Sequence, residues 1–286
     1  MKQIKYFIQF TFVYLLFIIF RLLGLKLASN LSSKIAFLVG PFFRSKSLIT
    51  SNLLRALPNL NQCEINRISK NMWGNYGRIL SEYVFIKDIR KSKIQNIIHV
   101  EGQQILEKIK KENKPVIFIS GHFNNFELMA LHIEKSGINL AAVYRPLNNK
   151  FLNSIMVKIR KKYICKNQIK KGISGTRELL SCVKNNISIA LMIDQRVSQG
   201  IKSKFFNYDA LTTTIPAQFA KKYQCKIVPI YIERKNDINF KLTVHKPVEY
   251  DVDETIENIT LKLNTLLEKM ILKNPDQWIW SHNRWK

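Results

Sequence analysis

The chain has 286 residues, 46% of them hydrophobic, and 46 Lys and Arg against 20 Asp and Glu give it a net charge of +26. This length and apolar content suit a folded domain with a sizeable core and exclude a disordered polar chain. The charge favours anionic partners: nucleic acid, phospholipid or phosphorylated glycolipid, or an acidic carrier protein. The alternative is that a coding bias towards Lys, Asn and Ile explains most of the charge.

The four cysteines are scattered without C-x-x-C spacing: Cys63, Cys165, Cys182 and Cys225. This pattern argues against a zinc site and against a disulfide framework. Reduced thiols fit a globular part that faces the cytosol.

The N-terminus is strongly apolar, with no charged residue from Tyr6 to Phe20. A helix of this length reaches about 22 Å, short of the ~30 Å hydrocarbon core, but snorkelling of Arg21 and Lys26 would extend it to Ala28. No small-x-small cleavage site follows, so we expect residues 1–28 to form an uncleaved membrane anchor rather than a signal peptide. The basic residues after it favour a cytoplasmic body.

After the anchor, residues 29–98 are predicted to be a helical lead-in, with apolar residues at helical spacing over 47–57 and 62–86. From residue 99 to 286, helices alternate with short β-branched runs. Strands are expected at 115–120, 139–144, 188–193, 226–232 and 239–245, and helices at 102–112, 124–136, 148–162, 174–185, 214–224 and 252–273. This order predicts an α/β fold with a mixed sheet flanked by helices, in a single domain over 29–286.

The segment from Val116 to Glu127 carries the strongest chemical signal. A buried-type strand leads to His122 in a Gly-flanked turn, and Glu127 follows as a helix begins. A histidine can take a proton from a hydroxyl, and a carboxylate on its other ring nitrogen would orient it. The alternative is structural, because Asn124 to Glu127 also resembles a helix capping box.

Other chemistries lack their motifs. The sequence has no G-x-S-x-G, no H-E-x-x-H, no G-x-G-x-x-G and no Walker sequence. We therefore expect no metal and no cofactor, and direct transfer to an acceptor hydroxyl is the simplest remaining reaction.

Three candidate residues follow predicted strands and should meet at one sheet edge: His122, Arg145 and Asp194. Arg145 is placed to grip a phosphate or carboxylate, and Asp194 to hold Arg145 or Arg196 or to cap a turn. No acid occurs between Glu134 and Glu178, where eleven Lys and Arg form a predicted basic surface for an acidic protein or headgroup. A merely soluble basic face is the alternative.

Aromatic residues mark two further segments. Phe205-Phe206 would line an acyl groove or fill the core. The C-terminal segment, residues 274–286, contains three Trp among basic residues. It suits a membrane interface or nucleobase platform, and equally the packing of a core.

Taken in order, these segments resemble the late acyltransferases of lipid A biosynthesis, the lauroyl/myristoyl transferase family, over essentially the whole chain. The resemblance rests on the apolar N-terminus and on a set of motifs: Ser120 to Glu127, Val143 to Asn149, Lys171-Gly172, Asp194-Gln195, Phe205-Phe206, Thr212 to Thr214, Val228-Pro229 and Pro275 to Lys286. The family often has Asp where Arg196 stands, which bears on acyl-chain or acceptor preference.

The resemblance implies a glycerolphosphate-acyltransferase-like fold at the cytoplasmic face of the inner membrane. It implies acyl carrier protein thioester as donor and a Kdo-bearing, phosphorylated lipid A precursor as acceptor. His122 and Glu127 would be the catalytic dyad, and the expected substrate-binding residues are Arg145, Asn149, Lys171, Asp194 and Arg196. A lysophospholipid or other glycolipid acyltransferase is the enzymatic alternative. A nucleic-acid or membrane-coating protein is the non-enzymatic one, and no nucleic-acid motif supports it.

Overall fold

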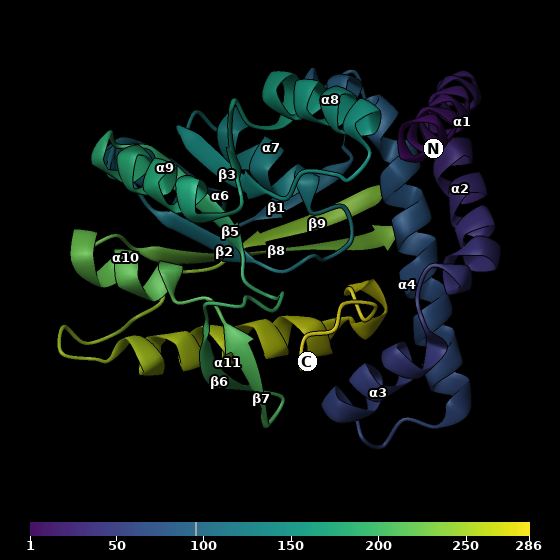
Figure 1. The fold of residues 1–286 in the computed structure, drawn as a ribbon. Coiled ribbons are helices and arrows are strands. Elements are labelled where there is room, and N and C mark those ends of the chain that lie inside the picture. Colours follow the sequence, from purple (N-terminus) through teal and green to yellow (C-terminus); the bar gives the residue numbers. More distant parts are fainter. Residues whose placement is uncertain (95) are drawn as a thin grey trace.

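A seven-stranded mixed sheet forms the centre of the molecule in the computed structural model, which describes residues 1–94 and 96–286 (Figure 1). Its spatial order is β1-β9-β8-β2-β5-β3-β4. The strands are β1 (Ile98–Glu101), β2 (Ile117–Ser120), β3 (Leu140–Tyr144), β4 (Asn167–Lys170), β5 (Ser188–Met192), β8 (Ile227–Asn236) and β9 (Asn239–Val244). The α/β class and the mixed sheet predicted from the sequence are confirmed.

Parallel pairing dominates the half of the sheet that carries the site. β2 lies between β5 and β8 and is parallel to both, and β3 is parallel to β5 and β4. All four residues of β2 are buried, as its unbroken apolar run predicts. The long β8 pairs antiparallel with β9, which makes the sheet mixed.

The sequence did not predict β1, β4 or the separate hairpin of β6 (Ile201–Phe205) and β7 (Tyr208–Thr212). β1 and β4 are only four residues long and carry polar side chains, so neither shows a clear strand pattern. The hairpin closes at Phe206 and Asn207, which have φ values of 50° and 63°. Two consecutive positive φ angles are typical of the tight turns that join hairpin strands.

Helices cover both faces of the sheet. In Figure 1, α7 and α8 lie above the sheet and α11 below it. The helices of this part are α6 (Gln103–Glu112), α7 (Glu127–Lys135), α8 (Lys150–Ile159), α9 (Ile173–Lys184), α10 (Ile215–Tyr223) and α11 (Ile256–Lys273). Each lies within a predicted helical range or extends one residue beyond it. A π-helical turn, η3 (Arg160–Ile164), continues α8.

The helical lead-in consists of α2 (Leu25–Val39), the 3-10 turn η1 (Gly40–Phe42), α3 (Lys46–Ala56), α4 (Gln62–Glu82), the 3-10 turn η2 (Tyr83–Phe85) and α5 (Ile86–Arg90). Gln95, inside the range predicted to be helical, lies outside the described residues. α4 begins with a capping box of Asn61 and Glu64. A Cβ atom at Gly77 would lie 2.2 Å from the carbonyl oxygen of Ser32, so glycine allows α2 and α4 to pack this closely.

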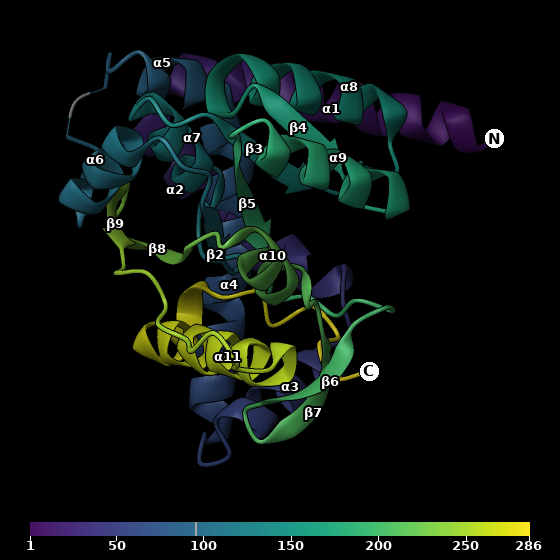
Figure 2. The ribbon, with the colours of Figure 1, turned by 90° about the vertical axis from the view of Figure 1, so that its left-hand side faces the viewer.

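The N-terminal helix α1 (Lys2–Leu23) is long and apolar enough to cross a membrane by length and composition, and 6% of its most apolar window is buried. The helix ends five residues before Ala28, the predicted end of the anchor, because Gly24 adopts φ 77° and breaks the helix. Figure 2 shows α1 running past α8, with the N-terminus projecting beyond the rest of the molecule. Phe7 and Phe10 pack against Phe151 of α8.

Candidate active site

His122 lies in the turn between β2 and α7, at the carboxyl end of a central parallel strand. The turn is tightened by Asn124, which has φ 40°, and Asn125 donates a hydrogen bond from its amide to Glu82 at 2.8 Å. The His122 side chain is 22% exposed, so a substrate can reach its outer edge. The ring of Phe126 stands edge-on to the imidazole, with centroids 4.9 Å apart.

The carboxylate that contacts the ring belongs to Asp194. Nδ1 of His122 lies 2.8 Å from Oδ1 of Asp194, and the backbone N–H of His122 donates to Oδ2 at 2.7 Å. The contact follows from strand pairing: Ser120 of β2 is in register with Met192 of β5, and each site residue lies two positions further on. Asp194 was expected to hold Arg145 or Arg196, and in the described residues it pairs with neither.

Asp194 is fully buried and nevertheless ionised. Burial raises the pKa of a carboxyl group, but the adjacent His122 and hydrogen bonds from His122 and Trp278 outweigh it, so the pKa of Asp194 is lowered. An ionised carboxylate on Nδ1 keeps the proton on that nitrogen and leaves Nε2 as the basic atom.

Glu127 contacts other partners than His122. Its Oε1 accepts hydrogen bonds from the hydroxyl of Tyr83 at 2.5 Å and from Nε and Nη2 of Arg160 at 2.9 and 2.5 Å. Among the described residues no hydrogen bond joins Glu127 to His122. The orienting contact expected of Glu127 is therefore made by Asp194 in this structure.

The Glu127–Arg160 pair is largely buried, with the side chains 7% and 13% exposed. Burial lowers the pKa of Arg160, but the Glu127 carboxylate outweighs it and the net shift is upward. Burial, with Glu127 next, holds the pKa of Tyr83 well above its usual value. Both the arginine and the phenol thus keep their protons and their bonds to Glu127.

Arg145 and Lys171 lie next to each other at the same sheet edge. Tyr144 of β3 is in register with Lys170 of β4, and the N–H of Lys171 donates to the carbonyl of Tyr144 at 2.8 Å. The pKa of Lys171 is lowered, first by burial and then by the charge of Arg145. Two adjacent cations of this kind suit an anionic ligand.

The remaining two predicted site residues have structural partners. Asn149 caps α8, accepting from the N–H groups of Phe151 and Leu152, and donates its amide to the carbonyl of Tyr6 in α1 at 2.8 Å. The backbone N–H of Arg196 donates to Nε2 of His282, and its Nε donates to the carbonyl of Lys286. Asn149 therefore contacts the N-terminal helix, and Arg196 contacts the C-terminal segment.

The sequence did not identify the C-terminal segment as a neighbour of the site. The indole N–H of Trp278 donates to Oδ2 of Asp194 at 2.9 Å, and the carbonyl of Gln277 accepts from the N–H of Asn124 at 3.0 Å. Trp278 and Trp280 are 2% and 0% exposed, so these two residues pack in the core. Phe205 and Phe206 are also buried, against Trp285, and fill the core.

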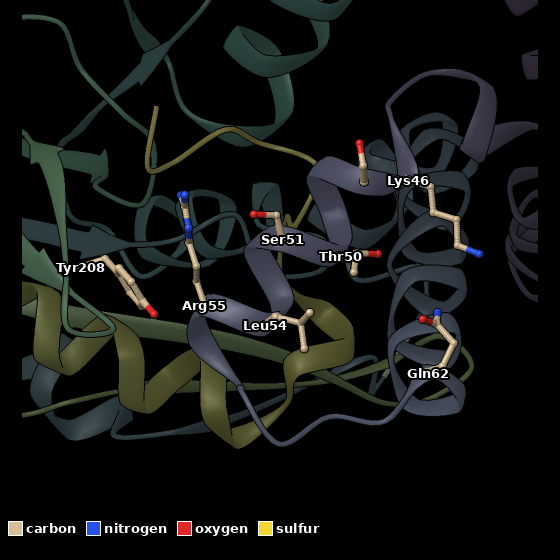
Figure 3. A pocket seen from close by; sticks show the side chains of 8 residues that line it. Lys46, Thr50, Ser51, Leu54, Arg55, Gln62 and Tyr208 are labelled. Atoms are coloured by element: carbon tan, nitrogen blue, oxygen red, sulfur yellow. The ribbon is translucent and has the colours of Figure 1, made fainter.

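The cavity in Figure 3, of about 740 Å³, lies between α3 and the tip of β7. It is lined by Lys46, Ser47, Thr50, Ser51, Leu54, Arg55, Gln62 and Tyr208, none of them a predicted site residue. Within residues 1–94 and 96–286, no group of three or more His, Cys, Asp or Glu side chains is arranged to hold a metal ion.

A histidine–carboxylate pair at the carboxyl end of a parallel strand, with Arg145 and Lys171 at the same sheet edge, is an arrangement typical of an enzyme active site. The family of bacterial lipid A biosynthesis acyltransferases matches residues 1–286. The chain belongs to this family.

Two lipid A acyltransferases of Escherichia coli are similar to the chain over most of its length. The lipid A biosynthesis palmitoleoyltransferase of Escherichia coli is 23% identical over 262 residues, covering 90% of this chain and 84% of its own. The E. coli lipid A biosynthesis myristoyltransferase is 20% identical over 247 residues, covering 85% and 75%. Among solved structures, the 1-acyl-sn-glycerophosphate acyltransferase of Thermotoga maritima aligns with a TM-score of 0.43 and 13% identity over 90% of this chain and all of its own.

Proposed function

We propose that the protein transfers a fatty acyl chain from acyl carrier protein thioester to the hydroxyl of a 3-hydroxyacyl chain on a Kdo-bearing lipid A precursor. Membership of the lipid A acyltransferase family supports acyl transfer onto lipid A. The observation that carries the mechanism is the hydrogen bond between Nδ1 of His122 and Asp194. It leaves Nε2 as the basic atom on a partly exposed ring.

In this mechanism Nε2 of His122 takes the proton of the acceptor hydroxyl as its oxygen attacks the thioester carbonyl. The C–O bond forms, a tetrahedral oxyanion develops, and its collapse breaks the C–S bond. The proton on Nε2 then passes to the departing thiolate, which leaves as the thiol. No acyl-enzyme intermediate is required, and the imidazolium is stabilised throughout by Asp194.

The oxyanion needs hydrogen-bond donors, and the turn after β2 has few to offer. The backbone N–H groups of residues 122 to 126 already donate to Asp194, Gly121, Gln277 and Asn124. We therefore favour Arg145 over the turn as the group that faces the oxyanion. Lys171 beside it would take part in binding a phosphate or sugar acid of the acceptor.

Glu127 contributes to the proposed mechanism through its ion pair with Arg160. The two side chains form a buried pair beside the turn of His122, and Tyr83 fixes the same carboxylate oxygen. We propose that this cluster holds the start of α7, and with it His122, in the catalytic position. Loss of Glu127 would then lower turnover by disordering this arrangement.

The donor and the acceptor share one chemical property, their negative charge. Acyl carrier protein is acidic and the acceptor carries phosphates, which matches a net charge of +26 and the acid-free segment between Glu134 and Glu178. We propose that the exposed basic residues of this segment dock the carrier protein.

The apolar exterior of the N-terminal helices supports action at a membrane. Large side chains are exposed along α1, α2 and the following turn, among them Leu22 (82%), Leu38 (76%), Phe42 (89%) and Phe43 (73%). Exposed patches of this size mark interaction surfaces. We propose attachment to the inner membrane with the catalytic domain on the cytoplasmic face, where acyl carrier protein is found.

Acceptor competition tests the proposal. Membranes containing the protein would receive carrier-protein thioesters of several chain lengths, together with lipid A precursor with and without Kdo, and lysophosphatidate. We expect one acyl chain added to the Kdo-bearing precursor, detected by mass spectrometry. Transfer to lysophosphatidate alone would assign the protein to phospholipid acylation instead.

A further inference from the structure

The C-terminal segment holds both partners of the histidine–carboxylate pair. Trp278 donates its indole N–H to Asp194 at 2.9 Å. The preceding residue, Gln277, binds the turn of His122 twice: its carbonyl accepts from the N–H of Asn124 at 3.0 Å, and its Oε1 accepts from the Asn124 amide at 2.9 Å. Two consecutive residues thus contact the two strand ends that meet in the site.

The segment itself is fixed to the body of the molecule. Nε2 of Gln277 donates to the carbonyl of Arg234 in β8, and Oε1 accepts from the Arg234 N–H. Asp276 accepts from Arg67 and Asn71 of α4, at 2.6 and 2.8 Å. The segment can therefore act as a rigid support rather than as a loosely packed end.

The Asp194 carboxylate receives hydrogen bonds from His122 and from Trp278. The carboxylate is completely buried and accepts three hydrogen bonds, two from His122 and one from Trp278. Among the described residues, the Trp278 indole is the one donor to this carboxylate that does not belong to His122. Without it, Oδ2 would keep the backbone N–H alone, and the carboxylate could rotate away from Nδ1.

We propose that Trp278 is a positioning residue for acyl transfer, acting through Asp194 on His122. The inference rests on the proposed function and deepens it. It gives a mechanistic role to an indole that also packs against Phe205 and Trp280, with centroid distances of 6.0 and 4.7 Å.

The chain offers a matched control two residues further on. Trp280 is equally buried, and its indole N–H donates to the carbonyl of Pro275 at 2.7 Å instead of to a site residue. Trp278→Phe and Trp280→Phe each remove one indole hydrogen bond and a similar volume of packing. A purely structural role predicts the same outcome for both.

The experiment measures kcat and KM of the full-length chain in membranes, with both variants made in the wild-type and Asp194→Asn backgrounds. We expect Trp278→Phe to lower kcat about tenfold or more with KM within about twofold, since a hydrogen bond to a buried charge is lost. Trp280→Phe should keep kcat within about twofold. In the Asp194→Asn background, Trp278→Phe should change kcat by less than about twofold, because the charged carboxylate that orients His122 is gone.

Equal kcat values for the two variants, or an undiminished effect of Trp278→Phe without the Asp194 carboxylate, would overturn the inference. If Trp278→Phe does not fold, β-(3-benzothienyl)alanine at position 278 replaces the N–H by sulfur while the ring shape is kept, and the same comparison applies. Full activity of Asp194→Asn would instead refute the proposed mechanism, and failure of the wild-type chain to acylate the lipid A precursor would refute the proposed function, so these failures are distinguishable.

Discussion

His122 and Asp194 are 72 positions apart, and parallel pairing of β2 with β5 brings Nδ1 of the one to 2.8 Å from Oδ1 of the other. The Asp194 carboxylate is fully buried, while the His122 side chain is 22% exposed. This arrangement separates the orienting group from the substrate.

Replacing Asp194 by Asn should lower kcat about a thousandfold or more, because the amide no longer fixes the proton on Nδ1 or stabilises the imidazolium. Steady-state acyl transfer with carrier-protein thioester measures the effect. Asp209→Asn is the control, since that carboxylate pairs with Lys204 on the exposed hairpin. A loss of less than about tenfold for Asp194→Asn would contradict the proposed orientation of His122.

Breaking the Glu127–Arg160 pair from one side should destabilise the protein by about 3–5 kcal/mol, because a buried charge is left without its partner. Glu127→Gln and Arg160→Met test this by denaturant unfolding in detergent. The double variant should recover most of the stability but not the activity. Lys204→Met, in a pair whose side chains are 60% and 55% exposed, should cost at most about 1 kcal/mol. If both pairs lose the same free energy of unfolding, the Glu127–Arg160 pair is not effectively buried.

The free energy of unfolding should fall as the pH decreases from about 6.5 to about 4. Burial lowers the pKa of His282 to about 4, and it also lowers the pKa of His132 and of His245. In this window the unfolded state binds protons that the folded state does not, so acid favours unfolding. Above the usual histidine pKa, both states leave these histidines neutral, and their full contribution to the free energy of unfolding is present.

His282→Gln should reduce this slope, because the amide oxygen can still accept from the N–H of Arg196 but does not titrate. Unfolding curves at several pH values, compared between wild type and variant, give the proton count directly. An unchanged slope would mean that His282 is protonated in the folded protein.

Phe42→Ser combined with Phe43→Ser should weaken binding to lipid vesicles by about a hundredfold or more, since each exposed ring contributes on the order of 1.5–3 kcal/mol when it leaves water. Vesicle flotation of the full chain measures the partition. Val252→Ser is a control at a residue that is 96% exposed in a loop before α11. Unchanged flotation of the double variant would place η1 outside the lipid-binding surface.

Five of the seven sheet strands, and the sheet edge that carries the candidate site residues, could be predicted because they depend on local patterns. Short apolar runs separated by helical segments imply parallel strands, and His122, Arg145 and Asp194 each follow such a run. The principle that strand ends share one edge then places the three together.

The partners of the site residues could not be predicted in this way. Which carboxylate reaches His122 depends on the neighbour of β2 in the sheet, and the sequence does not show that this neighbour is β5. Arg160 looked like one basic residue among many, and the sequence does not show that the end of α8 lies against Glu127. Trp278 reaches Asp194 across 84 positions, a contact that no local spacing indicates.

The most direct test of the account is acyl transfer to the Kdo-bearing lipid A precursor by His122→Gln, compared with wild type at equal amounts of folded protein. Glutamine keeps a polar side chain of similar length but cannot act as a base at Nε2. We predict that the singly acylated product, counted by mass spectrometry, falls by at least about a thousandfold while the melting temperature changes little. Product formation near the wild-type rate would contradict the mechanism and reduce His122 to a structural residue of the turn.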